Sequence, residues 1–500
     1  MLDPIIPQCA SYHSLAAHPA YAGNPLIEAL PPIASEDVVT VHLRNHPPST
    51  TARQRALPVH ERVHCVSDID DLVVALPSAF DVECALSVML RRGYAARNPF
   101  DIEWRRHHYR VKEIMSEPLV DYQFRSKTVP AMMVTGVSGS GKTTLVERLL
   151  EMYPQTISHT RYLNEPFNVC QLVWIKVNAS FDASLKGLVL SMFGAVDDAL
   201  GTNYRQQYEK SKASIDTMIG SLSQVFATHH LGVLFVDEIQ CLMLRGDDEA
   251  KLALSLFLKL GNVCRVPIIF GGTYAATRLF SKVARNARRV CSGGYFDLAL
   301  PGSYGDPVWG KLVVELVWKK YQWVDKPTPL TEALRLQLHT LSQGILAVFI
   351  ALHRASQVFA IRNNLPTVDG KVLQRVYDTQ FVLLHQALDA LRSGKANRLE
   401  RFEDLLPPKD QLNSLLRPTS EETLVERIQR LLISDSAAED GGNDGVRGAA
   451  ESPRQAQPNH GSSVGVQNDG TAASAAEVLL EKIGANAELA RLARQAGLMR

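Results

Sequence analysis

The chain has 500 residues, of which 46% are hydrophobic and 21% are charged, with 53 basic and 52 acidic side chains. This length exceeds what one hydrophobic core supports and predicts two or three folded units joined by linkers. The formal net charge of +1 excludes nucleic-acid binding through bulk positive charge. Any DNA contact must therefore come from a local basic patch.

The cysteines and the N-terminus predict a soluble, intracellular protein. The seven cysteines are widely spaced and form no CxxC pair, which is typical of reduced thiols in a cytosolic protein. The N-terminus lacks the basic region and apolar stretch of a secretory signal. No apolar run approaches the roughly 20 residues that a membrane span needs.

Two segments precede the first predicted strand. Residues 1–60 are rich in Pro, His and Ala with weak periodicity, which predicts a flexible, extended or partly ordered arm. Residues 61–128 include SDIDDLVVALPSAFDVECALSVMLRRGY, where apolar residues recur at helical spacing after an acidic start. We expect a small helical N-terminal unit over this second range.

Residues 129–305 alternate short apolar strands with helical stretches, the signature of an α/β fold with a parallel sheet core. The predicted strands are AMMVTG, QLVWIKV, GVLFVDE, VPIIFGG and a weaker FDLAL. Each is nearly continuous in hydrophobicity, as strands covered on both faces must be.

The remainder is predicted to be helical at first and then disordered. Residues 306–400 form a helical lid, and residues 401–434 a helical extension. Residues 435–474 are mostly Ala, Gly, Asp, Asn, Ser and Gln, which cannot bury enough apolar surface to offset the entropy of ordering, so we expect a disordered linker. Residues 475–500 carry an apolar stripe at helical spacing, which predicts an amphipathic helix that docks on a partner or folds back on its own chain.

The first motif that carries chemistry is GVSGSGKTT, which follows the strand AMMVTG and precedes the helical LVERLL. It satisfies GxxxxGK[ST], the pattern whose backbone N–H groups surround phosphates at a helix N-terminus. The lysine reaches the β- and γ-phosphates, and the first threonine coordinates Mg²⁺. The predicted ATP-binding residues are Gly136, Val137, Ser138, Gly139, Ser140, Gly141, Lys142, Thr143 and Thr144.

The second motif is the acidic pair at the end of GVLFVDE. Asp237 suits the Walker B role of holding Mg²⁺ together with Thr143, and Glu238 suits a general base for the attacking water. The alternative is an acidic pair that only ends a strand in solvent.

Two later segments complete the predicted catalytic set. Thr273 follows VPIIFGG at the sensor-1 position, unless Gly271 and Gly272 only form a tight turn there. An arginine from RLFSKVARNARRV would then enter the site of a neighbouring subunit and neutralise transition-state charge. The candidates are Arg289, then Arg288, then Arg285, with a solvated basic face as the alternative.

These motifs, in this order and followed by a helical lid, resemble an AAA+ P-loop ATPase. Five segments of the sequence resemble the TnsC/TniB transposition regulators of Tn-seven-like elements, with TnsC the best fit. They are MMVTGVSGSGKTTLVERLL, VLFVDEIQCL, IIFGGTYAATRLF, HERVHCVSDIDDL and RRGYAARNP. The resemblance covers about residues 60–395.

The resemblance implies a bacterial, cytoplasmic, DNA-associated ATPase that uses ATP and Mg²⁺ and regulates DNA transposition. Such proteins assemble as rings or filaments on duplex target DNA and link a target selector (TnsD- or TnsE-like, or a guide-RNA complex) to TnsA- and TnsB-like transposase subunits. ATP hydrolysis drives disassembly, and the C-terminal tail is the expected transposase contact. One departure concerns the lid, where Ala347 stands at the place of the sensor-2 arginine, with Arg354 as a possible substitute.

The DNA-contacting residues are only weakly indicated. The resemblance assigns them to NYRQQYEKSKAS, where we name Arg205, Lys210 and Lys212, and WRRHHYRVK is a competing segment. A solvated helix is the alternative for the first segment. Two other functions share the P-loop, namely a signalling NTPase switch with only protein partners and a helicase-loader-like AAA+ protein.

Overall fold

The computed structural model describes residues 7–14, 18–117, 130–179, 184–281 and 290–393. All of them belong to one compact unit, within Met1–Glu439. The predicted arginine cluster, helical extension, linker and terminal helix lie wholly or almost wholly outside these residues.

Each of the five parallel strands of the central sheet overlaps a predicted strand, although the last one covers residues 294–297 rather than FDLAL at residues 296–300. They are β2 (Ala131–Thr135), β5 (Trp174–Asn178), β6 (Val233–Asp237), β7 (Ile268–Gly272) and β8 (Gly294–Asp297). Their order across the sheet is β5-β6-β7-β2-β8, and each neighbouring pair is parallel. The carboxyl ends of all five strands therefore meet at one edge, where ligands of open α/β sheets bind.

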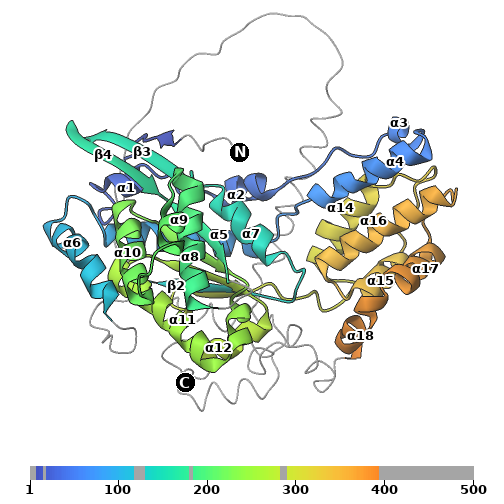
Figure 1. Cartoon of the computed structure of the whole chain (residues 1–500). Helices are drawn as coiled ribbons and strands as arrows, with labels where there is room; N and C mark the ends of the chain where they lie inside the picture. The colour runs from blue at the N-terminus through green and yellow to red at the C-terminus, as the bar shows by residue number, and fades with distance from the viewer. Residues whose placement is uncertain (1–6, 15–17, 118–129, 180–183, 282–289, 394–500) are drawn as a thin grey trace, which may run out of the picture. The chain divides into compact units, whose positions relative to one another are not determined.

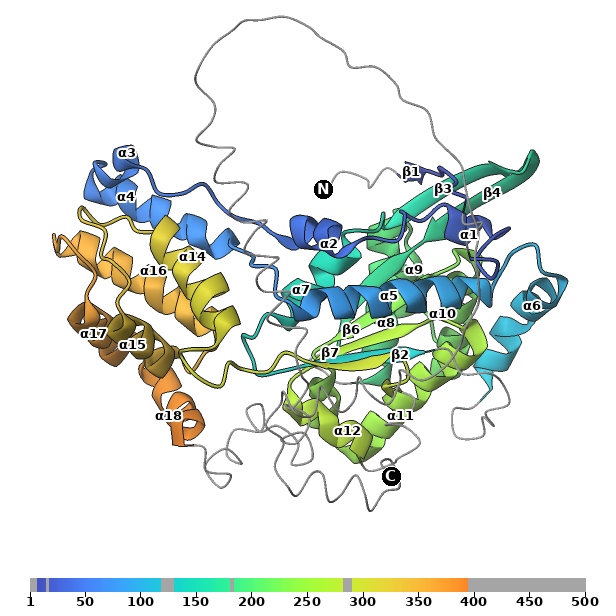
Figure 2. The same cartoon turned by 180° about the vertical axis from the view of Figure 1, so that it is seen from behind.

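Helices cover both faces of this sheet. One face is covered by α5 (Ser78–Ala95) and α7 (Lys142–Leu150), as Figure 2 shows. The other is covered by α8 (Leu185–Leu200), α10 (Ile215–Thr228) and α11 (Asp247–Lys259) (Figure 1). Neighbouring residues of a strand enter opposite cores, since Met132 packs with the first layer and Met133 with the second. This double burial explains why the strands are hydrophobic throughout.

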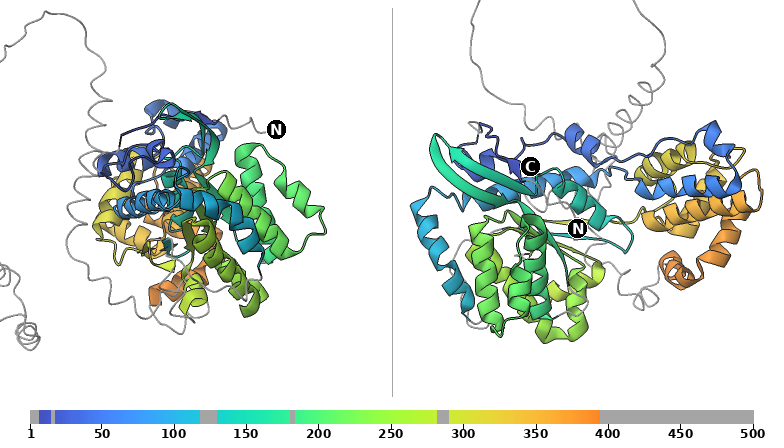
Figure 3. Two further views of the ribbon diagram at one scale, coloured as in Figure 1. Left: turned by 90° about the vertical axis from the view of Figure 1, so that its left-hand side faces the viewer. Right: turned by 45° about the horizontal axis from the view of Figure 1, so that its top comes forward.

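A second, smaller sheet was not predicted. It consists of β1 (Gln8–Cys9), β3 (Thr156–Tyr162) and β4 (Glu165–Leu172), in the order β1-β3-β4. The β3–β4 hairpin extends from the core in Figure 3, and its turn residues Leu163 and Asn164 both have positive φ. The predicted strand QLVWIKV is divided by this arrangement, because Leu172 ends β4 and Trp174 begins β5.

The described part of the predicted N-terminal arm is packed rather than extended. It contains α1 (Pro25–Glu28), α2 (Glu36–Leu43) and α3 (Ala52–Arg55). Leu26, Ile27 and Leu30 are almost fully buried against the α5 layer. These apolar residues are few and scattered among prolines, so their periodicity was too weak to predict helices.

The helices predicted for residues 61–128 are present, but they do not share one core. The first, α4 (Val59–Val66), and the 3₁₀ turn η1 (Ser67–Asp71) pack into the cluster formed by the C-terminal helices. The second, α5, covers the sheet, and the third, α6 (Ile102–Ser116), packs on α10. Helical spacing predicts an element and its buried face, whereas tertiary contacts select the core that the face joins.

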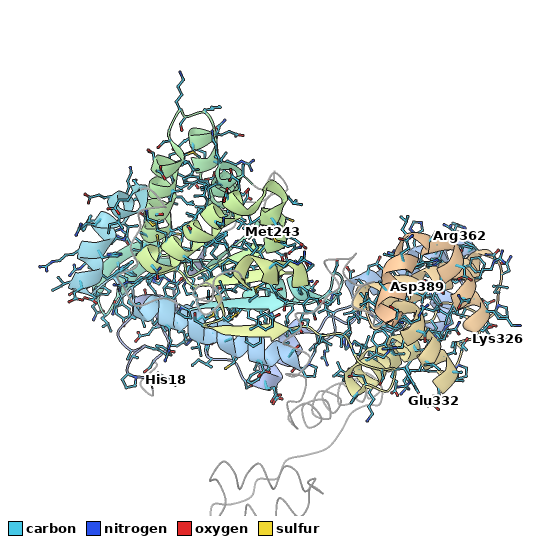
Figure 4. The ribbon with its side chains drawn as sticks, turned by 90° about the horizontal axis from the view of Figure 1, so that it is seen from below. His18, Met243, Lys326, Glu332, Arg362 and Asp389 are labelled. Carbon is cyan, nitrogen blue, oxygen red and sulfur yellow. The ribbon has the colours of Figure 1, made fainter. Side chains whose placement is uncertain are left out.

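The helices after residue 305 form a separate hydrophobic cluster around Trp309, Trp318, Trp323 and Phe349. They are η5 (Val308–Val314), α14 (Glu315–Lys320), α15 (Glu332–Ser342), α16 (Leu346–Arg362), α17 (Gly370–Gln380), η6 (Val382–Leu384) and α18 (His385–Ser393). Charged residues such as Glu332, Arg362 and Asp389 lie on their surface (Figure 4).

Short elements connect these parts. They are α9 (Tyr204–Glu209), η2 (Ile239–Arg245), η3 (Leu260–Cys264), η4 (Tyr274–Ala276) and α12 (Thr277–Ser281). Among the described helices, none is by itself long and apolar enough to cross a membrane; only α15 and α16, joined at a bend of 118°, pass that test of length and composition as a pair.

Candidate nucleotide-binding and hydrolysis site

The predicted phosphate-binding loop joins β2 to α7 at the carboxyl edge of the sheet. Gly141 lies just before α7 with φ of 94°, a conformation that favours glycine. The loop therefore delivers the N-terminus of α7 and its unpaired N–H groups to this edge. The Ser140 hydroxyl is buried and has no hydrogen-bond partner among the described residues. A bound phosphate oxygen would supply that partner.

Lys142 is the first residue of α7, and its side chain is buried. Its ammonium group donates a hydrogen bond of 2.8 Å to the carbonyl oxygen of Val137, in the same loop. Burial raises the pKa of Asp297, at the end of β8, and outweighs the hydrogen bond from Tyr274 and the charge of Lys142, which both lower it. The Asp297 carboxylate accepts this hydrogen bond from Tyr274 at 2.7 Å. The lysine thus lies in a polar pocket, held by a contact that it can exchange for a phosphate.

Thr143 and Asp237 meet directly across the sheet. The Thr143 hydroxyl donates to Oδ2 of Asp237 at 2.7 Å, which brings the phosphate-binding loop and the end of β6 together. The same Oδ2 lies 3.5 Å from the ammonium of Lys176, which also contacts Glu147 at 2.6 Å. Hydroxyl and carboxylate oxygens are the ligands that Mg²⁺ prefers, so these residues fit the predicted metal site.

The glycines of β7 make this contact possible. Since β7 lies between β6 and β2, the Asp237 side chain must extend over β7 to reach Thr143. A Cβ atom on Gly271 would lie 2.7 Å from Oδ1 of Asp237, and one on Gly272 would lie 2.8 Å from Oε1 of Gln240. Both glycines lie in the strand itself and do not form a turn. They leave room for the two polar side chains.

Glu238 and Thr273 are connected through Gln240. The Gln240 side-chain amide donates a short hydrogen bond to the Glu238 carboxylate, and its carbonyl oxygen accepts the Thr273 backbone N–H at 3.2 Å. Glu238 has φ of 53°, a left-handed conformation that costs a non-glycine residue about 1 kcal/mol or more. The structure therefore brings together Thr143, Asp237, Glu238 and Thr273 by a continuous set of contacts.

Two cavities adjoin the phosphate-binding loop. The larger has a volume of 360 Å³, and the smaller of 100 Å³; Ser140, Leu76, Leu298 and Leu346 line both. Pro77, Leu300, Pro301 and Trp309 line the larger cavity alone. Ser78, Asp297 and Asp306 add polar groups to its walls. A cavity of this size with both apolar and polar walls suits a planar base next to the phosphate site.

The lid contacts the loop through backbone atoms at the position where an arginine was expected. The Ala347 N–H donates to the Gly139 carbonyl oxygen at 3.1 Å. A Cβ on Gly139 would lie 3.0 Å from the Ala347 side chain, so both positions are small where they meet. Arg354, the suggested substitute, instead pairs with Asp70 of η1.

The remaining predicted residues lie elsewhere. Arg285, Arg288 and Arg289 are outside the described residues. Arg205 lies on α9, Lys210 ends that helix, and Lys212 follows it; all three are exposed.

Three polar residues of this site carry little sequence signal. Lys176 lies within the hydrophobic strand β5. A lysine in a strand that is otherwise buried is the one sequence signal here, because such a lysine usually has an acidic partner. Asp297 stands in the predicted strand FDLAL, at the same edge as the other strand ends. Gln240 follows the acidic pair by two residues, and only the turn η2 directs it back to the site.

A comparison with protein families agrees with this geometry. Residues 125–280 match the family model described as an AAA domain. The match covers less than a third of the chain and includes the phosphate-binding loop, β6 and β7. No curated protein matches the sequence.

Solved structures with weaker similarity include an ORC2 protein from Aeropyrum pernix in ADPNP and ADP complexes, with 13% identity, a TM-score of 0.33, and coverage of 68% of this chain and 96% of that one. The structure of Drosophila ORC bound to DNA has 13% identity and a TM-score of 0.32, and the match covers 70% of this chain and 84% of that one. A RuvB variant from Thermotoga maritima has 15% identity and a TM-score of 0.30, and the match covers 63% of this chain and 90% of that one. Likenesses this weak do not bear on function.

Proposed function

We propose that this protein is an AAA+ ATPase that binds ATP with Mg²⁺ at the carboxyl edge of its sheet and hydrolyses it. The observation that carries this proposal is the 2.7 Å contact between Thr143 and Asp237. It joins the phosphate-binding loop to the strand end that bears the acidic pair.

The side chains divide the chemistry among themselves. Lys142 exchanges the Val137 carbonyl for phosphate oxygens, and the N-terminus of α7 donates N–H groups to them. Thr143 and Asp237 hold Mg²⁺, which neutralises phosphate charge when bound. Glu238 accepts a proton from the attacking water, and Thr273 orients the water and the γ-phosphate.

The more specific proposal is that this ATPase regulates DNA transposition. It assembles as a ring or filament on duplex target DNA, links a target selector to TnsA- and TnsB-like transposase subunits, and leaves the DNA after hydrolysis. The support is the resemblance of the quoted segments to TnsC/TniB regulators. In this proposal Arg289 or Arg288 completes the site of a neighbouring subunit, and Arg205, Lys210 and Lys212 contact DNA phosphates.

The direct test combines ATPase assays, with and without duplex DNA, and electron microscopy of DNA with a slowly hydrolysed ATP analogue. We expect ATP-dependent rings or filaments. ATP turnover without any DNA binding at low salt would favour the protein-only switch. Turnover and DNA binding without assembly, together with replication genes beside this one, would favour the helicase-loader function.

The tail is tested separately by deleting residues 475–500. We expect unchanged ATPase and DNA binding together with weaker recruitment of the transposase in a pull-down assay. Normal recruitment by the shortened protein would refute the assignment of the tail as the transposase contact.

A further inference from the structure

The exposed face of α6 combines positive charge with an aromatic side chain. Arg105, Tyr109 and Lys112 follow one another at spacings of four and three residues, so they share one face of the helix. Arg106 and Arg110 lie beside them, and all five are exposed. The ring of Tyr109 is 82% exposed, which is unusual for a large aromatic side chain of a packed helix.

These charges are not neutralised within the described part of the chain. Arg105, Arg106 and Lys112 form no ion pair with any described residue, and Arg110 lies 3.9 Å from Glu113 in an exposed, weak pair. Arg106 and Arg110 are four residues apart, where like charges disfavour a helix. Ion pairing within the fold therefore does not explain this group of cations, and a partner outside the fold is the simplest reason for it.

The same helix has a separate structural face. Trp104, Val111 and Met115 are buried, and Lys259 donates hydrogen bonds to the carbonyl oxygens of Met115 and Glu117 at its end. The helix is therefore held rigidly against α10 and η3 while it presents its cations outward. An apolar face that is already buried cannot insert into a lipid surface, which disfavours a membrane as the partner.

The comparison with α9 shows why α6 is the better candidate. The aromatic residues near Arg205 face inward, since Tyr208 stacks on Phe193 at 4.5 Å and Tyr204 packs on the same ring. The Asp197 carboxylate accepts the backbone N–H groups of Tyr204 and Arg205 at 2.7 Å. An anion approaching the start of α9 therefore meets a carboxylate, whereas α6 offers four cations around an exposed ring.

We propose that the α6 face formed by Arg105, Arg106, Tyr109, Arg110 and Lys112 binds the phosphate backbone of duplex DNA. This inference rests on the proposed DNA binding and adds a contact surface to it. Several phosphate contacts of this kind give binding that tolerates any sequence and weakens steeply with salt. Tyr109 adds apolar contact with the sugar-phosphate chain between the arginines.

The test measures the salt dependence of DNA affinity for the full chain with ATP. The variant Arg105→Ala/Arg106→Ala/Arg110→Ala should bind duplex DNA at least about tenfold more weakly, and its slope of log affinity against log salt should fall by about 2 to 3. A matched control removes the same number of exposed charges from the lid, as Arg362→Ala/Lys371→Ala/Arg375→Ala, and should keep the slope. The triple variant Arg205→Ala/Lys210→Ala/Lys212→Ala measures how much α9 contributes to the DNA affinity and to its salt dependence.

The outcomes separate this inference from the proposed function. If the unmodified protein binds DNA and the α6 variant keeps its affinity and slope, the α6 surface is refuted while DNA binding stands. If the unmodified protein binds no DNA, the proposed function fails first. Binding of the unmodified protein to anionic vesicles but not to DNA, lost in the α6 variant, would overturn the choice of partner. Thermal unfolding and basal ATPase activity should match those of the unmodified protein.

A second inference concerns Gln240, whose two hydrogen bonds connect Glu238 with the backbone of Thr273. We infer that Gln240 is a positioning residue. It orients the Glu238 carboxylate and couples this orientation to the position of Thr273, directly after β7. A phosphate that moves Thr273 would thereby move the base as well. This inference rests on the proposed hydrolysis.

The test is a double-mutant cycle, because a residue that acts only through Glu238 has no effect once that base is absent. Gln240→Met removes both hydrogen bonds at similar size and should lower kcat about tenfold or more with an unchanged nucleotide Kd. In the Glu238→Gln background the same change should have no further effect. An equal loss in both backgrounds would refute the inference. An unmodified protein without turnover would instead refute the proposed hydrolysis.

Discussion

The two ends of the central sheet use positive charge in opposite ways. At the carboxyl end, Lys142 and Lys176 lie beside carboxylates and a loop carbonyl, in contacts that a ligand can replace. At the amino end, Arg97 is almost completely buried and donates to the carbonyl oxygens of Gly93, Leu231 and Gly232. Arg265 likewise donates to Ala96.

This difference distinguishes the end proposed to bind the nucleotide from an end with a structural role. The arginines of the amino end saturate backbone carbonyls that would otherwise be buried without a donor. Burial lowers the pKa of Arg97 to about 10, and the residue nevertheless stays charged at neutral pH. Substitutions at the carboxyl end should therefore alter ligand binding and turnover, and those at the amino end should alter stability.

The largest effect is expected from Lys142→Ala, which should abolish saturable nucleotide binding and DNA assembly together. The ammonium is the charged donor to the phosphates, and its loss leaves their charge uncompensated. Titration with a fluorescent ATP analogue measures the binding. Thermal stability without nucleotide should hardly change, and a strongly destabilised variant would contradict the division between the two ends.

The next effect is on the chemical step. Glu238→Gln should lower kcat by about 10² to 10⁴-fold while ATP binding persists, because the amide cannot accept the proton of the water. DNA-bound assemblies should last longer as a result. Steady-state turnover and dissociation in a chase experiment measure both, and unchanged turnover would remove Glu238 from its role.

At the amino end, Arg97→Leu should destabilise the fold by about 3 kcal/mol, since three carbonyl groups lose their donor. Nucleotide affinity, measured below the unfolding transition, should stay the same. Chemical denaturation gives the stability. Weakened nucleotide binding with an unchanged free energy of unfolding would contradict the structural role given to the amino end of the sheet.

A smaller effect on ATP binding is expected from Gly271→Ala, because the added methyl group would lie 2.7 Å from Oδ1 of Asp237 and 2.9 Å from the ring of Phe235. The carboxylate must shift away from Thr143, which should weaken Mg²⁺-dependent ATP binding by roughly tenfold, or about 1.4 kcal/mol. Gly261→Ala is the matched control, as the nearest atom to its added methyl would be 3.8 Å away. Titration of the Mg²⁺ requirement distinguishes the two variants.

The last prediction concerns the dependence of stability on pH, which needs no change of ligand binding. Burial, and then the charge of Arg97, lower the pKa of His230 to about 3; His108, His159 and His229 add to this. The unfolded chain therefore binds a proton near pH 6.5 that the folded chain rejects, so stability is complete above pH 6.5 and declines towards pH 3, with a slope approaching about 1.4 kcal/mol per pH unit.

The variant His230→Asn tests this decline, since asparagine tolerates the positive φ of that position. Its stability should fall less between pH 7 and pH 5 than that of the unmodified protein. His60→Asn, at a well-exposed site, is the control and should leave the slope unchanged. Equal slopes for all three proteins would mean that His230 does not contribute.

Much of the fold followed from local pattern. Each of the five core strands was predicted at least in part, because burial on both faces requires continuous hydrophobicity over a short stretch. The last strand begins two residues before FDLAL and ends within it. The β3–β4 hairpin escaped prediction because QLVWIKV is equally hydrophobic on both sides of the break at Val173. The packing of α1 and α2 escaped as well, because a few apolar residues among prolines carry no period.

The site shows the same division. The residue types and spacing of GVSGSGKTT and VDE were enough to predict a phosphate site with a metal site beside it, because that chemistry depends on a local backbone turn and a strand end. Only the tertiary structure decided that Gly271 and Gly272 make room for side chains, that Gln240 connects Glu238 with Thr273, and that Tyr109 is exposed while Tyr208 stacks on Phe193. These depend on which strands and helices become neighbours, and that choice is made by the packing of the whole chain.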